Sequence, residues 1–446
     1  MSKSQQTRRE FIKTTATASA GLSLALSSAA SYARILGAND RINLSVAGLN
    51  NRGMALIQSA INAAGDSVHI HSICDVDSRV IAEKSAQIAK AVGYTPATFK
   101  DYRKVLDQAD IDAVMIATPD HTHAPFAIYA MQADKHVYVE KPCSHNPREG
   151  ELLAQAAERY GMVVQMGNQQ RSAPTSIEAI QDIHGGVIGR AYMGKAWYSN
   201  ARGGIGVGQK VPVPEWLDWD LWQGPAPRRP YKDLYVHYNW HWFWHWGTGE
   251  INNNGLHELD ICRWALGVDY PSRVTSSGGR FAFDDDWEFY DTQIASYEYP
   301  DGKMIAWEGR SCNKFQYYDR GRGSMIYGTE GTVLLDRNGY FLYDADGQLV
   351  KQVNERAPSQ TTDIRGGGAL VDYHFENFFA AIRDGATLHS PIADGAVSTT
   401  MCHLGNLSQL YGRALTIDPA NGHIKGDKEA MSHWGREYED GWSPEI

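Results

Sequence analysis

Short apolar runs alternate with amphipathic segments along the chain as far as Gly167. Each run is followed by a segment whose apolar residues recur every three or four positions, which is the period of a helix. Strands that are buried on both faces read as continuous apolar runs, so this alternation predicts a doubly wound, parallel α/β sheet of the Rossmann type. The strands are expected at residues 42–48, 68–75, 112–118, 136–140 and 163–167, and the helices at 52–65, at 77–92, from Pro125 onward and at 148–161.

The pattern changes after Gly167. Residues 291–310 and 323–347 alternate between apolar and polar positions, with turn signals at Asp301-Gly302 and Asp346-Gly347. Such alternation is typical of antiparallel hairpins. Two amphipathic segments follow, near residues 371–383 and 395–411. We therefore expect a nucleotide-binding domain at 40–167, a second α+β domain with a large open, mostly antiparallel sheet at 168–418, and a C-terminal tail at 419–446 that packs on the body.

The first 33 residues differ from the rest of the chain in composition. Paired Arg8 and Arg9 precede Phe11 and a long uncharged run of Ala, Ser, Thr and Leu that ends in small residues. This arrangement resembles a twin-arginine export signal, cleaved after Ala33 or Ala30. An amphipathic helix or a membrane anchor is the alternative, but the run is too weakly apolar to anchor well. The expectation is a periplasmic protein that is exported already folded and has no membrane anchor after cleavage.

The composition narrows the class of protein. The chain has 446 residues, of which 43% are hydrophobic and 21% are charged, and its formal net charge is −10. These proportions are typical of a globular enzyme, and the acidic balance argues against a nucleic-acid partner. The five cysteines include no Cys-x-x-Cys pair, which argues against a disulfide scaffold and against a cysteine-based zinc site.

The first expected strand runs into the loop GLNNRG. A loop of this kind lets the helix that follows direct its N-terminus at a pyrophosphate. The candidate cofactor contacts in it are Gly48 and Gly53, at the first and last glycine positions of G-x-G-x-x-G, with Asn50, Asn51 and Arg52 between them. Asp75 ends the second strand, where a carboxylate accepts hydrogen bonds from an adenosine ribose and repels a 2′-phosphate. The predicted cofactor is NAD rather than NADP, and a polar strand-end cap is the alternative for Asp75.

Two further motifs follow strand ends, where ligands bind in open parallel sheets. The segment ATPDHTHAPF supplies Thr118, Pro119 and His123 as candidate cofactor contacts, and VYVEKP supplies Glu140 and Lys141. Lys141 is expected beside the nicotinamide, where its amine hydrogen-bonds a substrate hydroxyl. A surface lysine is the alternative interpretation.

The segment NWHWFWHWGTGEINNNGLHELDICRW concentrates five tryptophans and three histidines. His237, His241 and His245 are spaced four residues apart, which suits metal ligands on one helix face. The aromatic residues alternate as in a strand instead, so no metal site is expected. Aromatic rings pack against the C–H faces of sugars, and this strand is expected to line a sugar pocket, although core packing is the alternative for its tryptophans. The candidate pocket residues are Tyr238, Trp240, Trp242 and Trp246, joined by Asn168 and Arg171 after the last strand of the first domain.

The glycine loop and the two strand-end motifs resemble those of the Gfo/Idh/MocA family of sugar and inositol dehydrogenases, over essentially the whole chain after the signal. The resemblance implies a second domain whose open sheet mediates oligomerisation, so a homodimer or homotetramer is expected. It also implies a catalytic set made of the lysine of Glu-Lys-Pro and an Asp-x-Gly-x-His motif. Lys141 and His257 match this set, whereas Asn253 replaces the aspartate, which weakens the case for a carboxylate-assisted proton relay.

His257 is the candidate general base. The segment NNGLHELDICRWALG predicts a helix that begins at asparagine and ends at Gly267, with His257 in its first turn. The positive end of the helix dipole disfavours imidazolium, so the ring stays neutral and is able to accept a proton. Asp260, three residues later on the same helix face, is expected to orient the ring. A core histidine is the alternative.

Three functions are weighed for these residues. In an NAD-dependent oxidoreductase, His257 removes the proton of a sugar or glycoside ring hydroxyl, Lys141 polarises the oxygen, and a hydride passes to the nicotinamide. In a glycosidase that uses NAD transiently, as some exported relatives in the family do, there is no net redox change. A non-catalytic sugar-binding protein is the third, and the intact pair Lys141 and His257 argues against it. Because an exported protein meets no obvious pool of free NAD, the cofactor is expected to be tightly bound.

Overall fold

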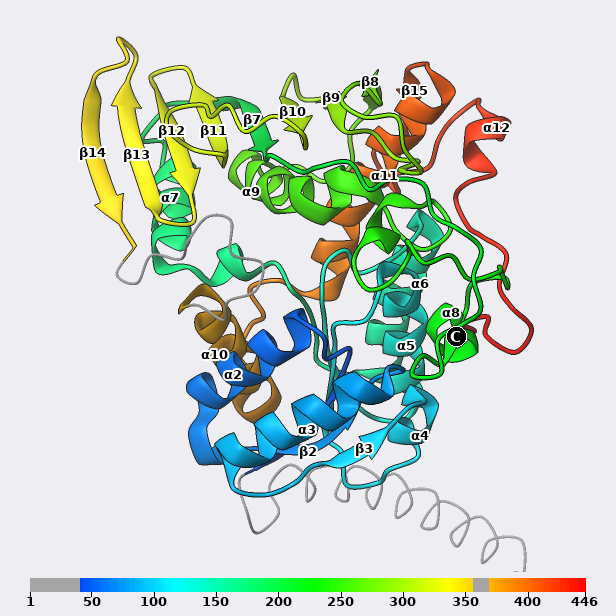
Figure 1. The fold of residues 1–446 in the computed structure, drawn as a ribbon. Helices are drawn as coiled ribbons and strands as arrows, with labels where there is room; N and C mark the ends of the chain where they lie inside the picture. Colours follow the sequence, from blue (N-terminus) through cyan, green and yellow to red (C-terminus); the bar gives the residue numbers. More distant parts are fainter. Residues whose placement is uncertain (1–40, 356–368) are drawn as a thin grey trace, which may run out of the picture. The chain divides into compact units, whose positions relative to one another are not determined.

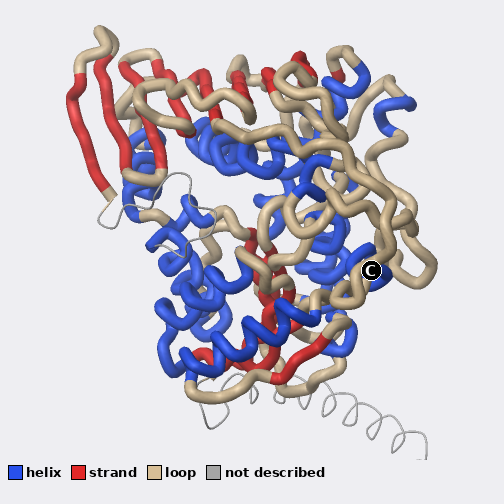
Figure 2. Tube along the Cα trace, in the orientation of Figure 1, coloured by secondary structure: helices blue, strands red, loops and turns tan. Residues whose placement is uncertain are grey.

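The computed structural model describes residues 41–355 and 369–446. The export signal expected at residues 1–33 lies outside them. Within the described ranges, no helix is both long enough and apolar enough to cross a membrane. From Asn43 onward the described residues belong to one structural unit, in which two sheets are separated by helices (Figures 1 and 2).

The first sheet has the strand order β3-β2-β1-β4-β5-β6. The pairs β2–β3, β1–β4, β4–β5 and β5–β6 are parallel, which confirms the doubly wound sheet predicted from the apolar runs. The apolar pattern does not predict β3, because its three residues are largely exposed. The strands are β1 (Ile42–Ala47), β2 (Val68–Cys74), β3 (Ala97–Phe99), β4 (Ala113–Ile116), β5 (His136–Val139) and β6 (Val164–Met166).

Helices follow the strands of this sheet and cover it (Figure 1). They are α2 (Arg52–Ala64), the 3-10 turn η1 (Gly65–Ser67), α3 (Ser78–Val92), α4 (Tyr102–Leu106), α5 (Asp120–Gln132) and α6 (Pro147–Tyr160). The start expected at Pro125 is wrong, because α5 begins at Asp120 and contains that proline. Proline donates no amide hydrogen bond to the carbonyl of His121, four residues earlier. Arg436 Nη2 donates to that carbonyl instead, at 2.5 Å. The C-terminal segment therefore supplies the hydrogen bond that the proline cannot make.

The second sheet has nine strands among the described residues, in the order β14-β13-β12-β11-β7-β10-β9-β8-β15. Its pairs are antiparallel except β7–β10, so the expected mostly antiparallel sheet is confirmed. The hairpins predicted at 291–310 and 323–347 form β9–β10 and β11–β12–β13. The strands are β7 (Ala191–Ser199), β8 (Arg273–Gly279), β9 (Thr292–Glu298), β10 (Met304–Arg310), β11 (Arg322–Gly328), β12 (Gly331–Asp336), β13 (Gly339–Asp344), β14 (Leu349–Asn354) and β15 (Leu415–Thr416).

The helical elements after β6 connect the two sheets. They are η2 (Gln169–Ser172), α7 (Pro174–His184), α8 (Trp219–Gln223), η3 (Asn239–Trp242), the π-helical turn η4 (Ile251–Gly255), α9 (Leu256–Leu266), α10 (Ala369–Asp384), α11 (Ile392–Tyr411) and α12 (Lys428–Met431). Chain order places α10 with the second domain, yet it packs on α2 of the first (Figure 1). Phe375 of α10 stacks on Tyr138 of β5 with ring centroids 4.5 Å apart, so its aromatic face completes the core of the nucleotide domain.

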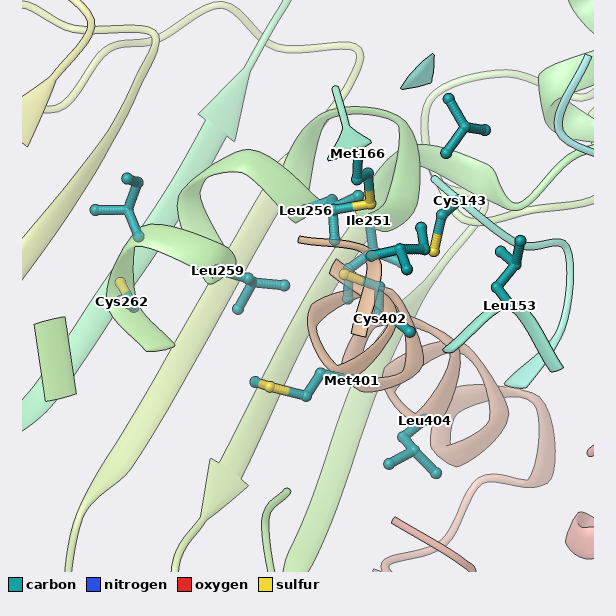
Figure 3. Close-up of a cluster of buried hydrophobic side chains, with 14 of the residues drawn as sticks. Cys143, Leu153, Met166, Ile251, Leu256, Leu259, Cys262, Met401, Cys402 and Leu404 are labelled. Carbon is teal, nitrogen blue, oxygen red and sulfur yellow. The ribbon is translucent and has the colours of Figure 1, made fainter. Parts of the chain in front are cut away.

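One buried apolar cluster joins the two domains (Figure 3). Thr399 of α11 lies 3.6 Å from Met166 Sδ at the end of β6 and 3.4 Å from Cys143 Sγ, and Ile251 and Leu256 belong to the same cluster (Figure 3). Interiors packed in this way resist displacement, because a shifted element loses contacts on several sides at once. The shared core therefore holds η4 and α9 in a defined position over the strand ends of the first sheet.

The strand expected through residues 237–246 is wrong. The backbone amides there bond locally, from Trp240 to the Tyr235 carbonyl and from Phe243 to the Trp240 carbonyl, as in a coiled loop rather than a ladder. The segment is a 3-10 turn followed by tight turns. Alternating aromatic residues therefore arise here from packing on two sides of a loop.

Candidate active site

A cavity of about 760 Å³ lies where the strand ends of the first sheet meet the second domain. The glycine loop, both strand-end motifs, part of the aromatic segment and the η4–α9 junction all contribute to its walls. The predicted site residues that line it are Gly48, Asn50, Asn51, Arg52, Asp75, Thr118, Pro119, His123, Glu140, Lys141, Tyr238, Trp240, Asn253 and His257. The topology of the two sheets thus brings together residues that are as much as 209 positions apart in the sequence.

The glycine loop has the close packing that a dinucleotide-binding turn requires. Gly48 has φ +83°, and a Cβ on it would lie 2.4 Å from the carbonyl oxygen of Ala117. A Cβ on Gly53 would lie 1.9 Å from the Gly48 oxygen, so Gly53 packs behind the loop and does not itself line the cavity. No side chain caps the N-terminus of α2, and its first turn holds no acidic residue. The amide groups there are suited to a phosphate oxygen.

Asp75 is held at the cavity wall by two backbone donors. Its Oδ2 accepts from the Leu49 amide at 2.8 Å and its Oδ1 from the Asp77 amide at 3.0 Å. Each carboxylate oxygen retains acceptor capacity, which suits ribose hydroxyls. The geometry fits the ribose of NAD. Because the same carboxylate also accepts from two backbone amides, Asp75 caps the strand end as well.

Glu140 and His123 shape the wall beside the expected nicotinamide position. Arg52 Nε donates to Glu140 Oε1 at 2.8 Å, which ties the start of α2 to the end of β5. The His123 ring lies between two carbonyl oxygens, 2.6 Å from that of Thr118 and 2.7 Å from that of Pro142. These contacts fix the two strand-end motifs relative to each other, and with them Lys141.

Lys141 reaches across to the second domain. Its Nζ donates to the Asn253 backbone oxygen at 2.6 Å and lies 3.1 Å from Asn253 Oδ1. Burial lowers the pKa of the Lys141 amine, whereas Glu140 and Asp120 act in the opposite direction. Asn253 therefore holds the amine with neutral oxygens, without the full charge that an aspartate would bring.

His257 lies in the cavity wall with a neutral ring, for a reason other than the expected one. His257 lies in the first turn of α9, as expected, but the backbone is already helical from residue 249 through η4, so no free helix end faces the ring. Burial is the main cause that lowers the pKa of His257 well below its usual range, and the cations of Arg337 and Arg322 lower it further. Within the described residues the ring has no hydrogen-bond partner, which leaves both nitrogens to a ligand.

Asp260 does not orient His257. It accepts a bidentate pair of hydrogen bonds from Arg171, at 2.7 Å to Nε and 2.8 Å to Nη2. This pair is buried and lies away from the cavity wall, so Arg171 is not brought to the candidate sugar pocket. Asn168 is buried behind the wall as well. Both residues follow β6, and the turn η2 directs Arg171 to α9 and α11, where it pairs with Asp260 and Asp394.

The aromatic segment divides between wall and core. Tyr238 and Trp240 line the cavity. Trp242 stacks on Trp287 at 4.0 Å between ring centroids, and Trp246 is fully buried in the same aromatic cluster, so the expected pocket role of these two is not supported and the core alternative holds for them.

The three histidines that are spaced four residues apart have separate partners. His237 Nε2 lies 2.9 Å from Asp77 Oδ2, His241 Nδ1 lies 2.6 Å from the Tyr238 oxygen, and His245 Nε2 lies 2.7 Å from the Pro227 oxygen. His237 and His241 line the cavity whereas His245 does not, so the regular spacing does not bring all three rings to one place.

Several charged residues of the wall are absent from the predictions. They are Lys100, Asp120, Arg202, Arg322 and Arg337. Arg202 follows β7, Arg322 begins β11, and Arg337 lies in the turn between β12 and β13. An arginine in a turn is usually solvent-exposed, and nothing in the sequence around Arg337 indicates that it lines a cavity. The one hint in the sequence is that Arg322 directly precedes an apolar strand.

Comparison with known proteins identifies the type of both domains. Residues 42–168 match the family model described as "Oxidoreductase family, NAD-binding Rossmann fold", and residues 188–333 match "Oxidoreductase family, C-terminal alpha/beta domain" of the same family. Together the two matches cover more than half of the chain.

Individual relatives are more distant. A glycosyl hydrolase family 109 protein from Shewanella sp. (strain W3-18-1) is 28% identical over 208 residues, which is 43% of this chain and 45% of the relative. The match therefore spans less than half the length of that curated relative. An oxidoreductase domain protein from Kribbella flavida has a similar fold, with a TM-score of 0.67, 19% identity, and coverage of 85% of this chain and 99% of that one. A levoglucosan dehydrogenase in complex with NADH and levoglucosan has a TM-score of 0.65, 20% identity, and coverage of 84% and 99%.

Proposed function

Because the chain belongs to the Gfo/Idh/MocA oxidoreductase family, we propose that it is an NAD-dependent oxidoreductase that takes a hydride from a ring hydroxyl carbon of a sugar or glycoside. The observation that carries the proposal is the juxtaposition of Lys141, Asn253 and His257 in one cavity with the glycine loop. A neutral base, a donor for the substrate oxygen and a cradle for the cofactor are the three parts that such a reaction needs.

The chain's own residues divide the work of the reaction. Tightly bound NAD supplies the hydride acceptor. The hydroxyl proton passes to the neutral imidazole of His257, while Lys141 Nζ donates a hydrogen bond to the same oxygen and stabilises its developing negative charge. The electron pair of the broken C–H bond leaves with the hydride, and the carbon–oxygen bond gains double-bond character. Asn253 keeps the Lys141 amine within reach of the substrate oxygen.

A glycosidase that uses NAD without net redox change is the second candidate. The Shewanella relative, named a glycosyl hydrolase, supports it. Both candidates begin with the same hydride removal, and they differ in whether an aglycone is then released. The levoglucosan dehydrogenase of similar fold supports a sugar substrate for either one.

One experiment tests the proposal and separates the two candidates. The purified protein is denatured, and the released small molecules are analysed by mass spectrometry for NAD(H). The native protein is then screened against glycosides, with absorbance at the NADH band and free aglycone recorded together. We expect NAD(H) in the denatured sample and an NADH signal with at least one glycoside. Release of NADP alone, or turnover by protein without any dinucleotide, would contradict the proposal.

Asn253→Asp is expected to lower turnover by about tenfold, because a carboxylate would compete with the substrate oxygen for the hydrogen bonds of the Lys141 amine. The new carboxylate would raise the pKa of Lys141 and pull the amine away from the substrate oxygen. One of its oxygens would also replace Asn253 Nδ2, which lies 3.4 Å from Glu250 Oε1, and the two carboxylates would repel each other. Turnover and bound NAD are measured together, so that loss of cofactor is separated from loss of catalysis. Equal or higher turnover would show that the amide has no specialised role.

We further propose that the protein is exported folded to the periplasm with its cofactor bound. The paired arginines at the start of the chain support this. Replacing both Arg8 and Arg9 by lysine is expected to leave the precursor in the cytoplasm, because the twin-arginine pathway reads that pair. Cell fractionation with immunodetection measures the outcome, and a variant with Lys3→Arg serves as the control. Undiminished export of the double variant would overturn the assignment.

A homodimer or homotetramer is part of the same proposal. Apolar side chains on the strands of the second sheet support it, since Ile294 of β9 is 54% exposed and Tyr192 of β7 is 38% exposed. Burial of such exposed apolar side chains by another subunit would be favourable, and this is the support for this part of the proposal.

A further inference from the structure

Four arginines line the cavity, and three of them have a carboxylate partner. The pairs are Arg52 with Glu140 at 2.8 Å, Arg202 with Glu250 at 2.7 Å and Arg322 with Glu258 at 2.7 Å. Arg337 is the exception, because within the described residues its guanidinium makes neither a hydrogen bond nor an ion pair. Among the described residues, Arg337 is therefore the one arginine of this cavity wall that no carboxylate contacts.

The carboxylates nearest to Arg337 are already engaged. Glu258 accepts from both Nε and Nη2 of Arg322, at 2.7 and 2.9 Å. Asp336, the preceding residue, accepts from Arg320 Nε at 2.6 Å and from the Asn338 amide at 2.7 Å. Burial and the neighbouring cation of Arg322 lower the pKa of Arg337 to about 9, so the guanidinium stays charged at neutral pH. A charge in such a place is costly unless a ligand supplies the opposite charge.

The position of Arg337 indicates which ligand that is. It belongs to the second domain, in the turn between β12 and β13, whereas the cofactor loop belongs to the first. Arg337 and His257 line the same cavity, and after burial the Arg337 cation is the largest cause that lowers the pKa of His257. The pyrophosphate of NAD has its own donors at the uncapped start of α2.

We propose that Arg337 binds an anionic group of the substrate, so that the sugar oxidised here carries a carboxylate, as uronic acids and glycuronides do. A guanidinium offers two parallel N–H donors, which match the two oxygens of a carboxylate. Pairing this cation with the substrate also removes the cost of leaving it unpaired, and the gain appears as binding selectivity over the neutral sugar. This inference rests on the proposed sugar oxidation and adds the class of sugar.

The test compares sugars that differ only in this group. Calorimetric titration of the NAD-loaded protein uses D-glucuronate against D-glucose, D-galacturonate against D-galactose, and the corresponding 4-nitrophenyl glycuronides against glycosides. The acid of at least one pair is expected to bind at least about tenfold more tightly than its neutral partner, as one charge-assisted contact predicts. Arg337→Gln is expected to reduce that ratio of affinities to about two or less. Arg337→Lys is expected to retain part of it, because lysine keeps the positive charge but lacks the two parallel N–H donors of the guanidinium. Arg190→Gln removes an equal charge from the exposed start of β7 and is expected to leave the ratio unchanged.

The outcomes separate the competing sources of the anion. Equal binding within every pair, or no binding of any acid, overturns the inference. If Arg337→Gln instead loses NAD, measured by mass spectrometry of the denatured variant, while the preference for acids persists, the arginine binds the cofactor and the inference is wrong. An acid preference that depends on Arg337 in a protein that never forms NADH would uphold the anion site and contradict the proposed oxidation. A melting temperature close to that of the wild type confirms that each variant is folded.

Discussion

His257→Ala is expected to lower turnover by about 10²–10⁴-fold, which is the usual contribution of a positioned general base. The ring faces the cavity without a hydrogen-bond partner in the described chain, and burial keeps it neutral. Its loss therefore removes the proton acceptor and little else. Bound NAD should remain, because His257 belongs to the second domain and the cofactor loop to the first.

The measurement is turnover together with the NAD content of the same sample. His184→Ala is the matched control, since His184 is exposed at the end of α7 and lies outside the cavity wall. Wild-type-like turnover in His257→Ala would reject the assigned base and return the histidine to a packing role.

Lys141→Ala is expected to be comparably damaging, again about 10²–10⁴-fold in turnover. The variant loses the donor to the substrate oxygen, and it also frees the Asn253 oxygens that hold the amine. Because Lys141 follows a strand of the nucleotide domain, we expect some loss of bound NAD as well. That second effect distinguishes it from His257→Ala.

Lys104→Ala serves as the control, since Lys104 is an exposed lysine of α4 whose amine pairs only with Asp107 within the described chain. Full retention of turnover in Lys141→Ala would place the substrate oxygen elsewhere in the cavity.

The sequence predicted the fold well where periodicity reflects burial. Continuous apolar runs identified the parallel strands β1, β2, β4, β5 and β6, and alternating runs identified the hairpins of the second sheet. Errors arose where local patterns compete with tertiary contacts. Pro125 lies inside α5, and Arg436, more than 300 residues later, donates the hydrogen bond to the His121 carbonyl that the proline cannot donate. The aromatic segment alternates like a strand, yet its amides are bonded within the loop.

The candidate site was predictable only in part, for a similar reason. The glycine loop, Asp75 and Lys141 follow strands, and parallel strands bring their carboxyl ends together whatever the rest of the chain does. No comparable rule predicts which residues of the second domain reach the site. Trp242 and Trp246 look the same in sequence as Trp240, but only Trp240 reaches the cavity. Arg337 resembles any polar turn residue until the sheet places its turn over the active site.

The central claim is that a ring carbon gives its hydride to the bound nicotinamide, and isotope transfer tests it most directly. NAD-loaded protein is incubated with a substrate from the glycoside screen that carries deuterium on its ring carbons, and the reaction is quenched with cold alkali within the first turnover, because the reduced dinucleotide survives alkali. The mass of the released cofactor is then measured by mass spectrometry. We predict that the reduced dinucleotide carries one deuterium in the wild type and none in His257→Ala. Product formation by the wild type with no deuterium in the cofactor would contradict the claim.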